Sequence, residues 1–258
     1  MIRLDRILLW IVAALAPVTA FAQPEKAVEK PFSIVLVHGA FVDASGWQAT
    51  YDLLTQHGYE VLVVQNSTLT LTGDVDATRR VIARARHPVV LVGHSYGGAV
   101  ITLAGNDPKV RSLVYLAAFA PDDGESVLKL ATQPVPGEPG PPLLPPSDGQ
   151  LIIDPAQFPA AFAAGADPAL ARFLADAQVP WATEAAGAPI TSPAWRAKPS
   201  AFLITANDHI IPPTTLRMMA RRAGGTTVEI ESSHAVMLTH PREVAAFIEK
   251  AASAVGQH

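Results

Sequence analysis

One short motif constrains this chain more than any other, the residues GHSYGG at 93–98. The motif follows the apolar run VVLV at 89–92 and precedes AVITLAG, which can form a helix. A strand that turns directly into a helix, with Ser95 at the corner and Gly93 and Gly97 two residues away, predicts a nucleophile elbow. Such a turn strains the serine backbone, and the glycines let strand and helix approach closely. Ser95 is therefore the predicted nucleophile, and an ordinary glycine-rich connection is the alternative.

A serine hydroxyl needs a base and an acid to become nucleophilic at neutral pH. His234 is the predicted base, because it follows the strand-like run TTVEIE and precedes the last helical pattern, whereas the nearby His240 directly precedes a proline at a helix start. Asp208 is the predicted acid, since it follows the buried run SAFLIT, and α/β sheets gather functional groups at the carboxyl ends of strands. Asp122 and Asp123, after an earlier strand, are the alternative acids.

Attack on a carbonyl group also requires backbone N–H donors for the oxygen that gains charge. Tyr96, directly after the serine, is one predicted donor. Ala40 or Phe41, in the loop after the first apolar run, supplies the other. Two histidines beside these donors, His38 and His94, are predicted to be structural.

Continuous runs of Val, Ile and Leu, rather than alternating ones, predict strands covered on both faces. The expected fold class is therefore α/β, with a mostly parallel sheet flanked by helices. The predicted strands are 33–37, 60–65, 89–92, 112–116, 201–205 and 226–230, and the predicted helices are 46–57, 75–85, 96–106, 214–223 and 241–255.

These motifs resemble the α/β-hydrolase superfamily and, within it, the branch of plant methylesterases and hydroxynitrile lyases with their bacterial relatives. The likeness rests on LVHGAF, LVGHSYGG, YLAAFAPD, NDHIIPP and SSHAVML, and it spans nearly all of the chain after residue 22. It implies a catalytic triad of Ser95, Asp208 and His234, with Ala40 and Tyr96 as oxyanion donors.

The same resemblance bears on the type of reaction. Lyases of that branch carry a threonine-bearing pair in the oxyanion loop and a lysine after the catalytic histidine. Here Gly39 and Ala40 occupy the loop, and Ala235 follows the histidine. No cation stands there to receive a cyanide leaving group, so hydrolysis is favoured over lyase chemistry.

The regular alternation of strands and helices stops within residues 121–199. The proline-rich tract at 133–146 is excluded from helices and central strands, and the alanine-rich stretch at 155–178 predicts short helices. An insertion here, between the sixth and seventh strands of the fold, predicts a lid above Ser95. The proline tract could instead be a disordered linker or a ligand for a partner's aromatic groove. The predicted pocket walls are Phe158, Phe162, Phe173, Trp181, Trp195 and Met237.

The first 22 residues predict where the protein works. Arg3 and Arg6 precede the apolar run ILLWIVAALA, and residues 20–22 match the small-any-small pattern of a signal-peptidase site. The apolar run is shorter than the roughly 20 residues of a membrane-spanning helix. We therefore expect residues 1–22 to be cleaved and the remaining residues, 23–258, to form one domain. The mature protein is expected to be periplasmic or secreted, without a stable membrane anchor.

Composition narrows the function further. The chain has no cysteine, which excludes a disulfide framework, and its 19 Lys and Arg against 23 Asp and Glu leave no basic stripe for nucleic acid. No metal site and no organic cofactor are expected. The combined prediction is hydrolysis of small apolar or aromatic carboxylic esters through an acyl-enzyme. The alternatives are C–C or amide cleavage or lyase chemistry on the same scaffold, and a non-catalytic binding protein.

Overall fold

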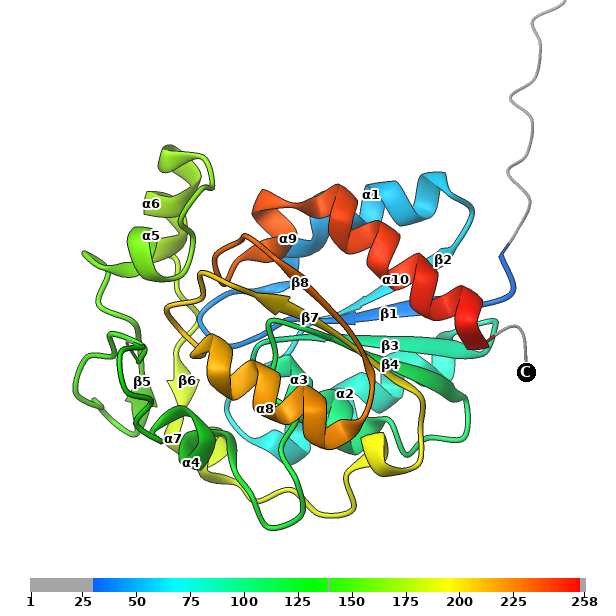
Figure 1. Ribbon diagram of the computed structural model, residues 1–258, viewed down its shortest axis with the longest axis horizontal. Helices are drawn as coiled ribbons and strands as arrows, with labels where there is room; N and C mark the ends of the chain where they lie inside the picture. Colours follow the sequence, from blue (N-terminus) through cyan, green and yellow to red (C-terminus); the bar gives the residue numbers. More distant parts are fainter. Residues whose placement is uncertain (1–29, 139, 256–258) are drawn as a thin grey trace, which may run out of the picture.

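The structure, a computed structural model, describes residues 30–138 and 140–255. The predicted export signal at 1–22 lies outside the described residues. A six-stranded sheet forms the centre of the described chain, in the order β2-β1-β3-β4-β7-β8 (Figure 1). All five strand pairings are parallel, as the sequence predicts. The strands are β1 Ser33–Val37, β2 Glu60–Val64, β3 Val89–His94, β4 Val110–Leu116, β7 Ser200–Thr205 and β8 Thr226–Ile230.

Helices cover both faces of this sheet. In Figure 1, α1, α9 and α10 lie on one side and α2, α3 and α8 on the other. This double cover explains why every residue of β1 and β3 is buried, whereas the edge strand β8 is half-buried or exposed along its length. The helices are α1 Gln48–Gln56, α2 Leu71–Arg84, α3 Gly97–Ala104, α8 Pro213–Ala223, α9 Val236–Thr239 and α10 Pro241–Val255.

Two helix starts differ from the sequence prediction for local reasons. α2 begins four residues before the predicted Val75, because the Thr70 side chain accepts a hydrogen bond from Gly73 N and caps the helix. The first predicted helix divides into a 3-10 turn at Ala44–Trp47 and α1, because Asp43 caps the turn through Ser45 N. Each of these two helix starts therefore depends on one capping side chain, Thr70 for α2 and Asp43 for the 3-10 turn.

The insertion, residues 121–199, joins β4 to β7, which are neighbours in the sheet. In Figure 1 most of it lies beside the ends of the strands, and its last residues run back below the sheet to the start of β7. Its small strands β5 and β6 pair antiparallel. The elements of the insertion are α4 Val127–Ala131, β5 Gln150–Leu151, α5 Phe158–Ala161, α6 Pro168–Asp176, β6 Trp181–Ala182, α7 Thr183–Gly187 and a 3-10 turn at Ala194–Arg196.

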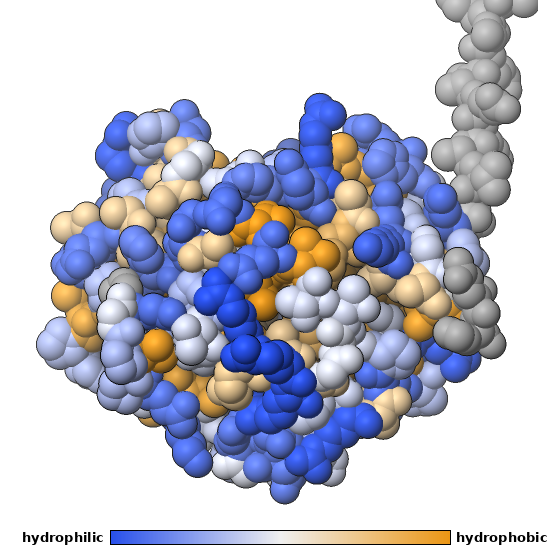
Figure 2. All heavy atoms as spheres, in the orientation of Figure 1, coloured by the Kyte–Doolittle hydropathy of each residue, from blue (hydrophilic) through white to orange (hydrophobic). Residues whose placement is uncertain are grey.

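The face of the molecule in Figure 2 carries both hydrophobic and hydrophilic side chains. Figure 2 shows hydrophobic side chains exposed between α8 and α10, over the edge of the sheet at β8, with hydrophilic residues around them. Within residues 30–138 and 140–255, no helix combines the length and the apolar character needed to cross a bilayer.

Candidate active site

Ser95 lies at the corner between β3 and α3, in a backbone conformation that side chains rarely adopt. Its φ angle is 55°, in the left-handed region that few residues other than glycine occupy. Two hydrogen bonds to its carbonyl oxygen hold the turn, from Gly98 N at 2.9 Å and Phe119 N at 3.1 Å. A Cβ atom at Gly97 would lie 2.6 Å from the carbonyl oxygen of Val37, so only glycine fits there. The corner therefore has the strained form that the motif predicts.

His234 and Asp208 form a buried pair. His234 Nδ1 donates to Asp208 Oδ2 at 2.8 Å, and both side chains are fully buried. Thr205 Oγ1 donates to the same carboxylate oxygen at 2.7 Å, while Oδ1 accepts from the backbone N–H groups of Ile210 and Ile211, each at 2.9 Å. These donors fix Asp208 at the carboxyl end of β7 and orient the imidazole toward it.

Electrostatics keep the carboxyl group ionised. Burial by itself would raise the pKa of Asp208, but the charge and hydrogen bond of His234, together with the bonds from Ile211 and Thr205, lower that pKa overall. Because Nδ1 of His234 carries a proton toward this carboxylate, Nε2 has the free lone pair of a base. Nε2 is buried and has no hydrogen-bond partner in the described part of the chain.

His94, which the sequence predicts to be structural, packs against His234. Its ring lies 4.7 Å from that of His234, and its Nε2 donates to the His234 carbonyl oxygen at 3.0 Å. Full burial, followed by the nearby His234, lowers the pKa of His94 to about 3. His94 is therefore neutral, and it supports the imidazole of His234 from one side, while Phe162 contacts that ring edge-on at 4.9 Å.

The predicted oxyanion donors lie beside Ser95. Ala40, Phe41 and Tyr96 line one cavity with the serine, and a Cβ atom at Gly39 would lie only 2.6 Å from Ser95 Cβ. In the described ranges, no protein acceptor bonds to the backbone N–H groups of these three residues. The three residues expected to supply donors therefore line the cavity of Ser95, and their N–H groups are not used by other protein acceptors in that part of the chain.

His38 shapes the loop that holds two of these donors. Its Nδ1 donates to the Gly39 carbonyl oxygen at 2.8 Å, so Nε2 is the acceptor for Asn66 N at 2.8 Å. Asn66 returns a bond from Nδ2 to the His38 carbonyl oxygen at 3.0 Å. Burial lowers the pKa of His38, which stays neutral. It is a structural residue of the loop.

The cavity at Ser95 is narrow and apolar. Its volume is about 40 Å³. A wider cavity of about 450 Å³ adjoins it and shares Ala131, Thr132, Pro141 and Leu143 as walls. The remaining walls of the narrow cavity are Phe119, Leu128, Trp181 and Ile210, besides Ser95 and the oxyanion residues. Nearly all these walls are hydrocarbon.

Among the predicted pocket residues, Trp181 lines this cavity and contacts the rings of Tyr96 at 5.3 Å and Phe41 at 5.8 Å. Phe158 and Phe162 do not line this cavity: they stack on each other at 4.7 Å, and Phe162 packs against His234.

The other predicted walls also lie away from the cavity. Trp195 donates from Nε1 to the Pro121 carbonyl oxygen at 3.0 Å, and Met237 is buried within α9. Phe173 is 64% exposed on α6. The walls that sequence analysis missed include Pro141 and Leu143, in the proline-rich tract. That tract packs over the site, and the turn that brings it there gives no periodic signal.

The alternative acid and base residues have other partners. Asp122 accepts from Arg196 Nε at 3.0 Å, and Asp123 accepts from Ser192 N at 3.1 Å. His240 Nδ1 pairs with Thr239 Oγ1 at 2.8 Å. Asp208 is thus the carboxylate that contacts His234.

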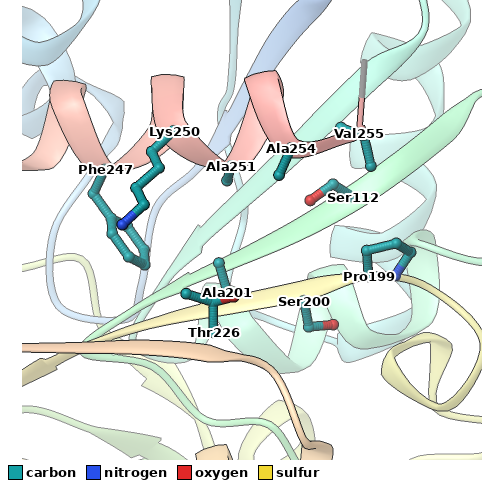
Figure 3. Close-up of a pocket in the computed structure, with 10 residues that line it drawn as sticks. All are labelled: Ser112, Pro199, Ser200, Ala201, Thr226, Phe247, Lys250, Ala251, Ala254 and Val255. Carbon is teal, nitrogen blue, oxygen red and sulfur yellow. The ribbon is translucent and has the colours of Figure 1, made fainter. Parts of the chain in front are cut away.

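Another cavity, separate from the two near Ser95, lies at the opposite ends of the strands. Figure 3 shows it between the last turns of α10 and the beginnings of β7 and β8, with Lys250 and Phe247 on one side and Ser200 and Thr226 on the other. Its volume is about 220 Å³. None of the predicted catalytic residues lines it. The described residues also contain no cluster of His, Asp and Glu able to hold a metal ion.

Comparisons with known proteins identify relatives of this chain. A curated relative, a carbendazim hydrolyzing esterase from Nocardioides sp. (strain SG-4G), is 36% identical over 120 residues, which span 41% of this chain and 50% of that esterase. The chain thus covers about half the length of this relative.

Solved structures share the fold. A pyrethroid hydrolase from Sphingobium faniae JZ-2 matches with a TM-score of 0.73 at 23% identity over 88% of this chain and 100% of the other. The methylesterase MES16 from Arabidopsis matches with a TM-score of 0.68 at 19% identity over 86% and 99%. The predicted fold and superfamily are confirmed, because the model of the alpha/beta hydrolase family matches residues 34–247. The chain belongs to the alpha/beta hydrolase family.

Proposed function

We propose that this protein is a serine hydrolase that cleaves small apolar or aromatic carboxylic esters through an acyl-enzyme. The observation that carries the proposal is the strained Ser95, which shares one apolar cavity with the unpaired N–H groups of Ala40, Phe41 and Tyr96. The buried pair of His234 and Asp208 supplies the general base and its orienting acid. Each part of an acyl-transfer site is then present in one chain.

Acylation uses these groups in order. Ser95 Oγ attacks the ester carbonyl carbon while His234 Nε2 takes the hydroxyl proton, and Asp208 stabilises the imidazolium that forms. The N–H groups of the oxyanion loop and Tyr96 bind the oxygen that becomes negative. His234 then gives its proton to the leaving alcohol oxygen as the C–O bond breaks. Ser95 Oγ and His234 Nε2 are not hydrogen-bonded here, and such contacts often tighten only with substrate bound.

Deacylation repeats the same proton transfers with water. His234 Nε2 takes a proton from water, whose oxygen attacks the acyl carbon of the Ser95 ester. The tetrahedral intermediate collapses, Ser95 Oγ leaves, and it recovers the proton from His234. The products are a carboxylic acid and a free enzyme, without a metal or an organic cofactor.

The cavity walls favour a neutral, apolar substrate. Aliphatic and aromatic side chains surround Ser95, and the lining residues of the narrow and the wide cavity include no Lys or Arg to attract an anion. Glu138 at the wider cavity disfavours negative charge there. The names of relatives, an esterase, a pyrethroid hydrolase and a methylesterase, agree with ester hydrolysis.

A fluorophosphonate probe and a series of p-nitrophenyl esters with increasing acyl length test the proposal. We expect the probe to label Ser95 and turnover to be highest for short or aromatic acyl groups. Ser95→Ala should lower kcat by at least about 10³-fold. Failure of the probe to label the folded protein would revive the non-catalytic interpretation. Faster cleavage of amides or diketones than of any ester would favour the alternative reactions.

Export is part of the proposal. We infer that residues 1–22 direct the chain across a membrane and are removed, which leaves a periplasmic or secreted enzyme. N-terminal sequencing of the protein from its native host tests this, and Gln23 is the expected first residue. A protein that retains Met1 in the cytoplasm would contradict it.

A further inference from the structure

Asp74, in the first turns of α2, is a buried carboxylate that the proposed mechanism does not use. Asp74 is fully buried, and no Lys or Arg of the described chain forms an ion pair with it. A buried carboxylate is unfavourable unless hydrogen bonds replace water. Thr70 already caps α2, so Asp74 is not needed to begin the helix. Its hydrogen bonds lead instead toward the candidate active site.

One oxygen of Asp74 holds the residue next to the nucleophile. Tyr96 Oη donates to Asp74 Oδ2 at 2.9 Å, and the tyrosine is 1% exposed. Burial, followed by the negative charge of Asp74, raises the pKa of Tyr96, so the phenol keeps its proton as a donor. The backbone N–H of Tyr96 has no protein acceptor in the described ranges. The carbonyl end of the same peptide group, Ser95 O, accepts from Gly98 N and Phe119 N, and the side chain of Tyr96 adds a second, side-chain anchor beside it.

The other oxygen of Asp74 holds the loop between β2 and α2. Oδ1 accepts from Ser67 N at 2.8 Å, Ser67 Oγ at 3.0 Å and Thr68 N at 3.1 Å. Thr68 has a φ angle of 58°, which is strained for a β-branched residue. The bond from its N–H to Asp74 stabilises this conformation.

Thr68 in turn forms hydrogen bonds with the insertion. Its carbonyl oxygen accepts from Ala182 N at 3.0 Å, and its Oγ1 donates to the Pro180 carbonyl oxygen at 2.7 Å. These two bonds flank Trp181, whose ring contacts Tyr96 and lines the cavity of Ser95. Through these hydrogen bonds Asp74 connects Tyr96 with Trp181, two neighbouring walls of the cavity at Ser95.

We infer that Asp74 is a positioning residue for the proposed reaction: through Tyr96 it holds an oxyanion donor at the elbow, and through Thr68 it holds Trp181 against that donor. The inference rests on the proposed function. A small displacement of an oxyanion donor weakens binding of the transition state much more than binding of the substrate.

Tyr96→Phe tests the connection from Asp74 to Tyr96, because it removes the phenol oxygen and leaves the ring against Trp181. We expect kcat for a p-nitrophenyl ester to fall about tenfold with little change in KM. Asp76→Asn is the matched control on α2, since Asp76 is exposed and pairs only with Arg79 at 3.5 Å in the described chain. It should leave both constants unchanged.

A double-variant cycle separates positioning from general damage. Asp74→Asn should also lower kcat about tenfold, because the amide keeps one oxygen for the N–H groups of Ser67 and Thr68 and loses the oxygen that accepts from Tyr96. The double variant with Tyr96→Phe should lose about tenfold rather than a hundredfold, because both changes remove the same bond between Asp74 Oδ2 and Tyr96 Oη. A hundredfold loss in the double variant would overturn the inference. If Asp74→Asn does not fold, Tyr96→Phe alone still decides, since an unchanged kcat in that variant would also overturn it.

Hydrogen exchange measured by mass spectrometry does not depend on turnover. Tyr96→Phe should speed amide exchange in the peptide that covers the elbow and the first turn of α3, and Asp76→Asn should not. Unchanged exchange in the Tyr96 variant would overturn the inference even if esters are cleaved. A wild-type protein that cleaves no ester and is not labelled at Ser95, but shows faster exchange in the variant, would overturn the proposed function instead.

Discussion

Two buried carboxylates on different sides of Ser95 have similar hydrogen-bond sets and different ring partners. Asp208 accepts from two backbone N–H groups, a hydroxyl group and the imidazole of His234. Asp74 accepts from two backbone N–H groups, a hydroxyl group and the phenol of Tyr96. Each carboxylate is fixed by its loop and fixes one ring in turn.

The difference lies in what each ring can do with a proton. An imidazole that donates from Nδ1 still has a lone pair at Nε2, so it can accept a second proton and become a cation beside Asp208. The phenol of Tyr96 has only one proton, and its raised pKa keeps that proton in place. The same carboxylate surroundings therefore support proton transfer at one site and rigid placement at the other.

Replacing each carboxylate by an amide should separate these roles most clearly. Asp208→Asn should lower kcat by about 10³-fold to 10⁴-fold, because it favours the wrong tautomer of His234 and removes the charge that stabilises the imidazolium. Asp74→Asn should lower it only about tenfold. Steady-state kinetics with one p-nitrophenyl ester compare the two directly. Equal losses would mean that the two carboxylates do not differ in function.

Acid should lower the stability of the folded chain through the site around His234. His94 beside His234 has a pKa of about 3 when folded and about 6.5 when unfolded, so unfolding takes up a proton between these values. The free energy of unfolding should therefore decrease as the pH falls from about 6.5 toward 3. His38 and Asp208, whose pKa values are also lowered, act in the same direction.

Removing the His94 imidazole tests this dependence. In His94→Phe, the slope of the free energy of unfolding against pH should be smaller by up to about 1.4 kcal/mol per pH unit, measured by urea unfolding between pH 4 and 7. His209→Gln is the control, because His209 is exposed in the loop after β7. An unchanged slope in the His94 variant would show that this histidine does not titrate on unfolding.

The smallest expected effects come from the hydroxyl groups on the two carboxylates. Thr205→Val should reduce the free energy of unfolding by about 2 kcal/mol, and Ser67→Ala by about 1 kcal/mol because Ser67 is exposed. Only Thr205→Val should also shift the pH profile of kcat, since its hydroxyl group bonds the oxygen that faces His234. Chemical denaturation and pH–rate profiles measure these effects. A similar shift in Ser67→Ala would remove the distinction between the sites.

The sequence was sufficient to predict the sheet and the residues at its carboxyl edge. Apolar runs marked each strand because both faces are covered, and the ends of parallel strands meet at one edge. That rule predicts Asp208 after β7, and the motif GHSYGG predicts Ser95 after β3. The loop after β8 brings His234 to the same edge.

The cavity walls and the supporting residues could not be predicted in the same way. Aromatic residues in the insertion gave no sign of which would pack on one another, as Phe158 and Phe162 do, and which would face Ser95, as Trp181 does. Asp74 has the local sequence of any amphipathic helix, and its bond to Tyr96 joins residues 22 positions apart in the chain. Such roles arise from tertiary contacts that no short motif encodes.

The insertion leaves the sheet after β4 and returns at β7, two strands that pair directly from Leu113 with Ser200 to Leu116 with Leu203. A segment whose two ends are already brought together by the sheet can vary in length and composition without disturbing strand register. Changes within residues 121–199 should therefore alter the cavity walls while Ser95, Asp208 and His234 stay in place, because none of these three residues belongs to the insertion.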